Sequence, residues 1–230
     1  MADHFPLRVL CLLLCLLGWP LSGAAAPPQR IISLTPHLTE LLYDIGAGDR
    51  IVATDDASDF PPEVAPLPRV ANYRSINLEA LLAQKPDLVV AWRSAQSRML
   101  APVEKLGIPV FYSEPTDFAS LADEMRSLGR LLGTRQKADQ QADAYLAKLD
   151  ALKQRYGKPK PVSVFYQLWY PPLTSVNDST WPGRAIKLCG GRNIMADANT
   201  PYPQVGLEQV IKANPGLILA GSRDPAVLAH

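Results

Sequence analysis

The chain has few of the side chains that build metal centres and catalytic triads. Its 230 residues include three cysteines and three histidines. It contains no Cys-x-x-Cys, His-Glu-x-x-His, Gly-x-Ser-x-Gly or phosphate-binding Gly-Lys-Ser/Thr motif. Beyond Ala26, histidine occurs only as His37 and His230. This scarcity predicts that the protein is not an enzyme, and it leaves a metal-dependent α/β enzyme as a remote alternative.

An excess of charge of either sign is also absent. Lys and Arg number 23 against 22 Asp and Glu, which gives a net charge of +1. No basic stripe is present, so we expect no nucleic acid or anionic membrane surface as a partner. Beyond Ala26, no apolar run reaches the roughly 20 residues that a membrane-spanning helix needs.

The segment 1–26 has the pattern of a secretory signal peptide. Arg8 precedes an apolar run over 9–17, and Ala24-Ala25-Ala26 offers a small-residue cleavage site. We expect a mature protein that begins near Pro27 and is soluble outside the cytoplasm. A lipid anchor on Cys15 is disfavoured because a bulky leucine precedes that cysteine.

Removal of the signal peptide leaves Cys189 as the single cysteine. An odd cysteine in an exported protein indicates either a missing disulfide partner or a free thiol. The chain stops shortly after an apolar run over 217–220. We therefore expect the carboxyl-terminal part of the fold to be incomplete. Cys189 is expected either to pair in a disulfide with a cysteine of a missing tail or to be buried as a free thiol.

One stretch of sequence occurs twice, at 73–91 and at 202–220, with a constant offset of 129. In each copy a proline separates a helical pattern from an apolar strand pattern. The repeat predicts one helix–strand unit used twice. The identical pairs are Tyr73/Tyr202, Leu78/Leu207, Glu79/Glu208, Pro86/Pro215, Leu88/Leu217 and Ala91/Ala220.

Strand and helix patterns alternate along the chain without hairpin signals, which predicts an α/β fold with parallel sheets. We expect an N-terminal lobe at 27–133, a connecting helix at 134–157 and a C-terminal lobe at 158–230. The pair Ile51 and Ala53 matches Ile194 and Ala196 at an offset of 143, which predicts a second-lobe strand over 194–196. The other expected strands are 31–34, 50–53, 88–91, 108–112, 161–167 and 217–220.

Aromatic residues follow directly after strands in both lobes. Trp92 follows the strand at 88–91, and Trp169 and Tyr170 follow the strand at 161–167. Ligands of open parallel sheets bind beyond the carboxyl ends of strands. With Tyr73 and Tyr202, these rings predict an interlobe cleft for a large, flat, partly apolar ligand. Packing in the core remains an alternative for each ring.

Three further residues, Arg93, Pro36 and His37, are candidates for contact with the ligand. Arg93 could meet a carbonyl or carboxylate of the ligand. Pro36 suits the first turn of a helix, and His37 beside it could contact a ligand, donate to a metal or be an ordinary first-turn residue. The Asp-rich segment 55–59 lacks the glycine and glutamate of a calcium loop, so no metal site is expected there.

Glu79 and Glu208 occupy equivalent positions in the two copies of the repeat. An acidic side chain in a first helical turn is favoured by the helix dipole, which explains either residue alone. A matched pair would also suit docking onto a symmetric partner through arginines.

These residues together resemble one family. The chain is similar to the cobalamin-binding periplasmic proteins of ABC importers, within the class III binding proteins for cobalamin, ferric siderophores and haem. The resemblance covers residues 30–221 and rests on Ser33-Leu34-Thr35-Pro36, Thr39-Glu40-Leu41, Asp59-Phe60-Pro61-Pro62, Asn77-Leu78-Glu79, Lys85-Pro86-Asp87-Leu88-Val89-Val90-Ala91-Trp92-Arg93, Cys189-Gly190-Gly191, Asn193-Ile194 and Pro203-Gln204-Val205.

The resemblance implies two α/β lobes, one long connecting helix and a ligand between the lobes. It implies a monomer that carries cobalamin as a transported ligand rather than a cofactor. It also implies that Glu79 and Glu208 pair with arginines of an ABC permease dimer. The pocket aromatics of the cobalamin branch fall on Tyr73, Trp92 and Tyr202.

Some positions depart from the family pattern. Ala57 stands where the branch has another pocket aromatic, and the segment 168–171 is one residue shorter than expected. The tyrosine that binds iron in the haem branch falls on Asn72, which argues against haem. Because Tyr73 is adjacent, haem or a ferric siderophore remains the alternative ligand.

Overall fold

The computed structural model describes residues 26–157 and 160–221. The expected signal peptide, apart from its last residue, lies outside these residues. His230 and the rest of the segment after Gly221 also lie outside them. In the described part of the chain, no helix has both the length and the apolar character needed to cross a bilayer.

The N-terminal lobe is built on a five-stranded sheet of order β3-β2-β1-β4-β5. Every neighbouring pair in it is parallel. Parallel pairing requires a crossover between consecutive strands, and helices supply most of these connections. The strands are β1 (Ile31–Ser33), β2 (Ile51–Asp55), β3 (Arg69–Ala71), β4 (Leu88–Trp92) and β5 (Val110–Ser113).

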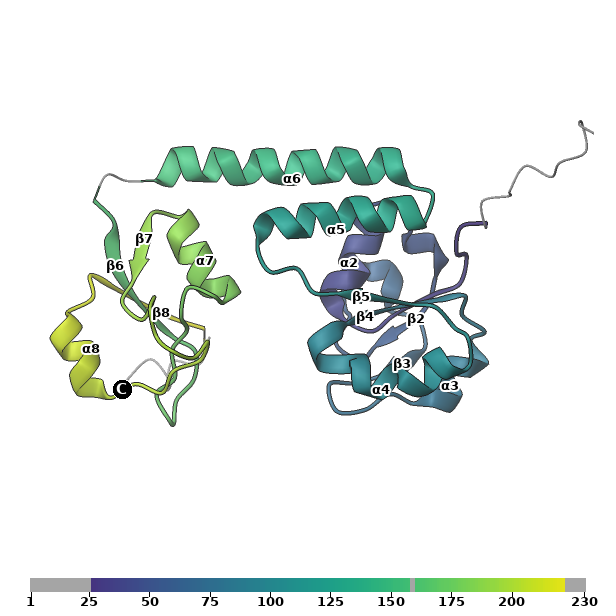
Figure 1. Cartoon of the computed structure of the whole chain (residues 1–230), viewed down its shortest axis with the longest axis horizontal. Helices are drawn as coiled ribbons and strands as arrows, with labels where there is room; N and C mark the ends of the chain where they lie inside the picture. Colours follow the sequence, from purple (N-terminus) through teal and green to yellow (C-terminus); the bar gives the residue numbers. More distant parts are fainter. Residues whose placement is uncertain (1–25, 158–159, 222–230) are drawn as a thin grey trace, which may run out of the picture.

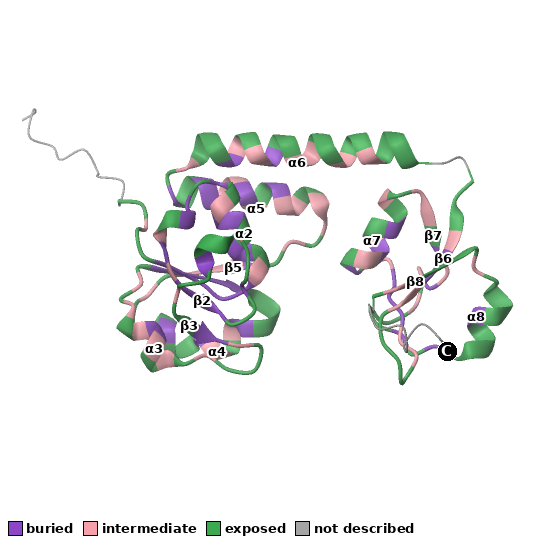
Figure 2. Cartoon of the chain, turned by 180° about the vertical axis from the view of Figure 1, so that it is seen from behind, coloured by how far each residue is buried: buried purple, intermediate pink, exposed green. Residues whose placement is uncertain are grey.

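Both faces of this sheet are covered by helices (Figure 1). Ile31 and Val90 point to one face, where they pack with α2 (Pro36–Asp44) and α5 (Phe118–Leu131). The alternating residues Ile32 and Val89 point to the other face and pack with α3 (Leu78–Ala83) and α4 (Arg93–Lys105). Because successive side chains of a strand alternate, the apolar run of β4 is buried on both sides. Figure 2 shows this core as purple segments between the layers.

The C-terminal lobe has a smaller parallel sheet of order β7-β6-β8. Its core contains Phe165, Met195, Val205 and Val210. Its elements are β6 (Val162–Gln167), α7 (Trp181–Leu188), β7 (Gly191–Asn193), α8 (Leu207–Ala213) and β8 (Leu217–Ala220). The N-terminal lobe also contains two short 3-10 helices, η2 (Gly48–Arg50) and η3 (Pro62–Val64).

The helix α6 (Arg135–Tyr156) joins the two lobes along one side of the molecule (Figure 1). It packs against α5, and Gly129 of α5 provides the space for Ala138 of α6, because a side chain at Gly129 would collide with the methyl group of Ala138. Its 22 residues at about 1.5 Å each give this helix a length of roughly 33 Å. The helix therefore reaches from one lobe to the other.

The repeated stretch forms the same helix–strand unit in each lobe, so this prediction is confirmed. Leu78 and Leu207 are the first residues of α3 and α8, and Leu88 and Leu217 begin β4 and β8. β4 pairs with β1 as β8 pairs with β6. The two lobes therefore share one local architecture.

The predicted strand over 194–196 is wrong. The strand is β7, which ends at Asn193, and the chain turns directly after it. Asn193 causes the turn: its side-chain amide donates to the carbonyl oxygen of Val176 at 2.8 Å, and its side-chain oxygen accepts from the backbone N–H of Met195 at 3.0 Å. Asparagine favours such turns because its side chain bonds the backbone two residues on. The short strand β3 was not predicted at all.

Candidate functional site

The strand orders define one switch point in each sheet. In the N-terminal lobe the chain proceeds outward from β1 to β2 and from β4 to β5, so the order reverses between β1 and β4. In the C-terminal lobe the chain goes from β6 to β7 on one side and then to β8 on the other, so the order reverses between β6 and β8. Crevices beyond the carboxyl ends of strands at such points are where open α/β sheets bind ligands.

A cavity of about 600 Å³ lies beyond the carboxyl ends of β1 and β4. Its size is within the range of small-molecule sites. Trp181, at the start of α7, belongs to the other lobe, so the cavity lies between the lobes. Its walls are formed by Pro36, His37, Glu40, Leu41, Asp44, Trp92, Pro115, Leu121, Met125, Tyr145 and Trp181.

His37 and Trp92 are brought together at this switch point. Their ring centroids are 5.9 Å apart and the ring planes cross at 82°. Pro36 fixes the first turn of α2, the helix that follows β1, and His37 is the second residue of this helix. Trp92 is the last residue of β4. Burial lowers the pKa of His37 below its usual value, and the nearby Asp55 carboxylate partly opposes this effect. The imidazole is therefore neutral at pH 7.

A buried polar network holds the wall behind His37 in place. Thr39 of α2 hydrogen-bonds Ser33 at 2.8 Å and Ser58 at 3.0 Å. Ser58 donates in turn to the carboxylate of Asp55, at the end of β2. Buried hydroxyl groups are costly to leave unpaired, so this network fixes α2 relative to β1 and β2.

The predicted aromatic residues of the C-terminal lobe lie on two adjoining loops. Trp169 and Tyr170 follow β6, and Trp169 is bridged to Thr174, which is bridged in turn to Gln204, close to Tyr202 in the chain. The rings of Trp169, Tyr170 and Tyr202 are 64 %, 48 % and 59 % exposed. They do not line the cavity, and they give the C-terminal lobe an accessible aromatic surface.

Two predicted residues of the N-terminal lobe also lie outside the cavity. Tyr73 is 82 % exposed, and the guanidinium group of Arg74 lies 5.0 Å from its ring centre. Arg93 lies over the ring of Tyr112 at 4.8 Å and near the carboxylate of Glu114 at 3.8 Å. Arg93 thus has partners within its own lobe.

Sequence reasoning missed Trp181. Its ring contacts Phe118 of α5 edge to face, with centroids 5.3 Å apart, so it joins the two lobes as well as lining the cavity. A signal was available: Pro182 marks a first helical turn in the C-terminal lobe just as Pro36 does in the N-terminal lobe. The side chain beside each proline faces the interlobe space.

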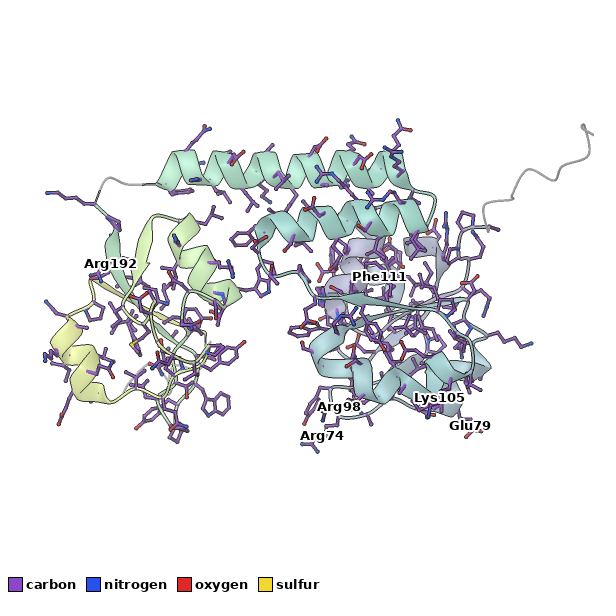
Figure 3. All side chains as sticks on the ribbon, viewed as in Figure 1. Arg74, Glu79, Arg98, Lys105, Phe111 and Arg192 are labelled. Carbon is purple, nitrogen blue, oxygen red and sulfur yellow. The ribbon has the colours of Figure 1, made fainter. Side chains whose placement is uncertain are left out.

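Glu79 and Glu208 are exposed and occupy the first turns of α3 and α8. Neither forms an ion pair with another described residue. Figure 3 shows Glu79 on the side of the N-terminal lobe that faces away from α6. Among the described residues, Asn77 caps α3 by accepting from the backbone N–H of Ala80 at 3.0 Å, and this leaves the Glu79 carboxylate unused in the cap.

Cys189 is an exposed free thiol among the residues described, so the alternative of a buried thiol is wrong. No cluster of three or more His, Cys, Asp or Glu side chains suited to a metal ion occurs in the described ranges.

Two parallel-sheet lobes, one joining helix and a cavity between the lobes define an α/β solute-binding protein. Residues 31–228 match the periplasmic binding protein family, and the chain belongs to this family. It is a family of binding proteins rather than enzymes, and membership places the chain in the periplasm.

The relatives and solved structures agree with this assignment. The chain is 38 % identical over 212 residues to the vitamin B12-binding protein of Vibrio campbellii, a match covering 92 % of this chain and 77 % of the relative. It is 37 % identical over 223 residues to the vitamin B12-binding protein of Yersinia pseudotuberculosis, covering 96 % and 78 %.

Among solved structures, the periplasmic vitamin B12 binding protein BtuF of Vibrio cholerae superposes with a TM-score of 0.77 at 37 % identity, covering 89 % of this chain and 80 % of the other. The periplasmic heme binding protein HutB of Vibrio cholerae superposes with a TM-score of 0.78 at 24 % identity, covering 87 % and 79 %. The second likeness concerns the fold alone.

Proposed function

We propose that this protein captures a corrinoid, with cobalamin as the reference ligand, between its two lobes and delivers it to an ABC importer. The observation that carries the proposal is the identity of 38 % and 37 % to proteins named as vitamin B12-binding, over 92 % and 96 % of this chain. An interlobe cavity with tryptophans from both lobes supports it, because flat macrocycles stack on aromatic faces.

The binding surfaces fall into two parts. His37, Trp92 and Trp181 form the cavity part, which Tyr145 of α6 also lines, and the first three remain partly accessible to solvent. Trp169, Tyr170 and Tyr202 on the C-terminal lobe, with Tyr73 on the N-terminal lobe, form an exposed rim. A large ligand would bury its flat centre in the cavity part and contact the rim with its peripheral amide groups.

A titration with three ligands tests the ligand class. Cyanocobalamin, haemin and a ferric hydroxamate are added separately to the full chain, and tryptophan fluorescence and visible absorbance are followed. Cyanocobalamin should quench the fluorescence with micromolar or tighter affinity, and the other ligands should not compete. Binding of haemin alone, with a tyrosinate–iron absorbance band, would replace the corrinoid assignment by haem.

Glu79 and Glu208 are proposed to dock the protein on a two-fold symmetric permease. Both carboxylates are exposed, lie in equivalent first turns and lack ion-pair partners among the described residues. Bidentate pairing with arginine would give each contact both strength and direction. A matched pair on two lobes would let one monomeric binding protein engage both halves of a dimer.

The double variant Glu79→Ala/Glu208→Ala tests docking. Transport by vesicles containing the cognate permease should be lost, while the Kd for cyanocobalamin stays unchanged. Asp150→Ala removes an exposed carboxylate from α6 and serves as the matched control with normal transport. A weakened Kd in the double variant would place the two carboxylates in the ligand site instead.

Two further proposals concern the export of the protein and the oxidation state of Cys189. The segment 1–26 is proposed to be a cleaved signal peptide, and Cys189 is proposed to be a disulfide-forming cysteine. Amino-terminal sequencing of the exported protein, and mass measurement before and after reduction, test these two points.

A further inference from the structure

His37 lies where a ligand could reach it, and among the described residues its imidazole contacts Trp92 but has no hydrogen-bond partner. It is the second residue of α2, it lines the interlobe cavity, and its side chain is exposed to that cavity. No hydrogen bond from either ring nitrogen to another described residue is present. Its imidazole is therefore available to a ligand.

The imidazole stands nearly perpendicular to the neighbouring indole, an arrangement compatible with axial coordination of a macrocycle stacked on that indole. Its plane crosses the plane of the neighbouring Trp92 ring at 82°. A flat macrocycle that stacks parallel to the indole of Trp92 would meet the imidazole of His37 edge on. An imidazole bound to the central metal of such a macrocycle presents its edge, because the donor lone pair lies in the ring plane.

The electrostatic state of His37 also suits metal coordination. Burial lowers the pKa of the imidazole, so at neutral pH the ring keeps the free lone pair that a metal requires. Asp55 is 5 % exposed and close enough for its carboxylate to oppose this effect.

We propose that His37 is an axial ligand of the cobalt in the bound corrinoid. This inference rests on the function proposed above. The macrocycle supplies the equatorial nitrogens, so the lack of any three-residue metal cluster among the described residues is no obstacle. In the binding step a ring nitrogen of His37 forms a bond to Co(III), and the water molecule that occupied that position leaves. No electron or proton is transferred.

The step makes the site selective for corrinoids with an exchangeable axial ligand. Aquocobalamin has a water that imidazole can replace. Cyanocobalamin has a tightly held cyanide at the same position, so it binds through stacking and amide contacts only. The protein should therefore prefer aquocobalamin over cyanocobalamin.

Absorbance titrations with both corrinoids test the inference on the full chain. Wild-type protein should shift the main absorbance band of aquocobalamin toward that of its imidazole complex, leave the spectrum of cyanocobalamin unchanged, and bind aquocobalamin at least about tenfold more tightly. His37→Ala and His37→Gln should abolish both the shift and the preference.

The outcomes separate this inference from the proposed function. Wild-type protein that binds both corrinoids without a change in the aquocobalamin spectrum would overturn the role of His37 and leave the corrinoid function in place. A shift that persists in both variants would also overturn it, because another residue would then be the ligand. Wild-type protein that binds neither corrinoid would remove the proposed function and this inference together.

Discussion

Lys85 and Asn214, which stand at equivalent positions in the two copies of the repeat, adopt the same left-handed backbone conformation, with φ of 49° and 45°. Each directly precedes the proline that separates helix from strand in its copy. Left-handed geometry costs most side chains about 1–2 kcal/mol, whereas asparagine tolerates it. The repeat therefore preserves a backbone conformation even where the residue type differs.

Lys85→Asn should stabilise the protein by about 0.5–1 kcal/mol, because it introduces the side chain that already occupies the equivalent position in the second lobe. The free energy of unfolding in urea measures the effect. Gln84→Asn, one position earlier and in right-handed helical geometry, is the control and should give no gain. Equal effects of the two changes would refute the conformational argument.

Gly129→Ala should destabilise the protein although alanine favours helices. The added methyl group would collide with the side chain of Ala138, at an overpacking cost of about 1–3 kcal/mol that outweighs the roughly 1 kcal/mol gained in helix propensity. Adding Ala138→Gly should restore stability by reopening the space.

Thermal unfolding of the single and double variants measures this coupling between α5 and α6. Gly206→Ala provides the control, since a methyl group there meets nothing within 4 Å. A double variant less stable than Gly129→Ala would show that the close approach of the two helices is not the cause.

Glu124→Gln should raise stability at neutral pH. Burial raises the pKa of Glu124, and the hydrogen bond that its carboxylate accepts from the backbone N–H of Glu114, at 3.3 Å, only partly opposes this. Because the folded-state pKa exceeds the unfolded one, the contribution of this carboxyl group to stability is present below its unfolded pKa and is lost as the pH rises through its folded pKa.

Melting temperatures of wild type and Glu124→Gln from about pH 4 to pH 8 measure this effect. The two curves should coincide at the acidic end and separate as the pH rises, with the variant more stable. Asp150→Asn, at an exposed carboxylate on α6, should show no such separation. Parallel curves for Glu124→Gln and wild type would contradict the assignment.

Local patterns predicted much of the fold, because apolar strands between helices and a repeat with a constant offset are local features. β7 escaped prediction because its residues Gly191–Asn193 carry no apolar run, and the apolar residues that follow belong to the turn set by Asn193. The match of residues 194–196 to a strand of the first lobe therefore did not predict a strand, because the Asn193 side chain turns the backbone at that point.

The candidate site could be predicted only in part, for a related reason. Trp92 and His37 could be predicted as site residues because Trp92 ends one apolar strand and His37 begins the helix after another strand of the same sheet. Trp181 reaches the cavity through the placement of one lobe against the other by α6 and through its contact with Phe118. That placement depends on tertiary packing, for which no short pattern exists.

Equilibrium dialysis with radiolabelled cyanocobalamin tests the central claim, that the cleft between the lobes binds a corrinoid, most directly. The full wild-type chain should retain one molecule per chain with micromolar or tighter Kd. Trp92→Ala/Trp181→Ala should weaken retention at least about tenfold, since loss of two stacking rings costs more than about 1.4 kcal/mol. Tyr156→Ala, which removes an exposed ring at the end of α6 outside the cavity walls, should leave retention unchanged. Absence of retention by the wild type, or equal retention by the double variant, would contradict the claim.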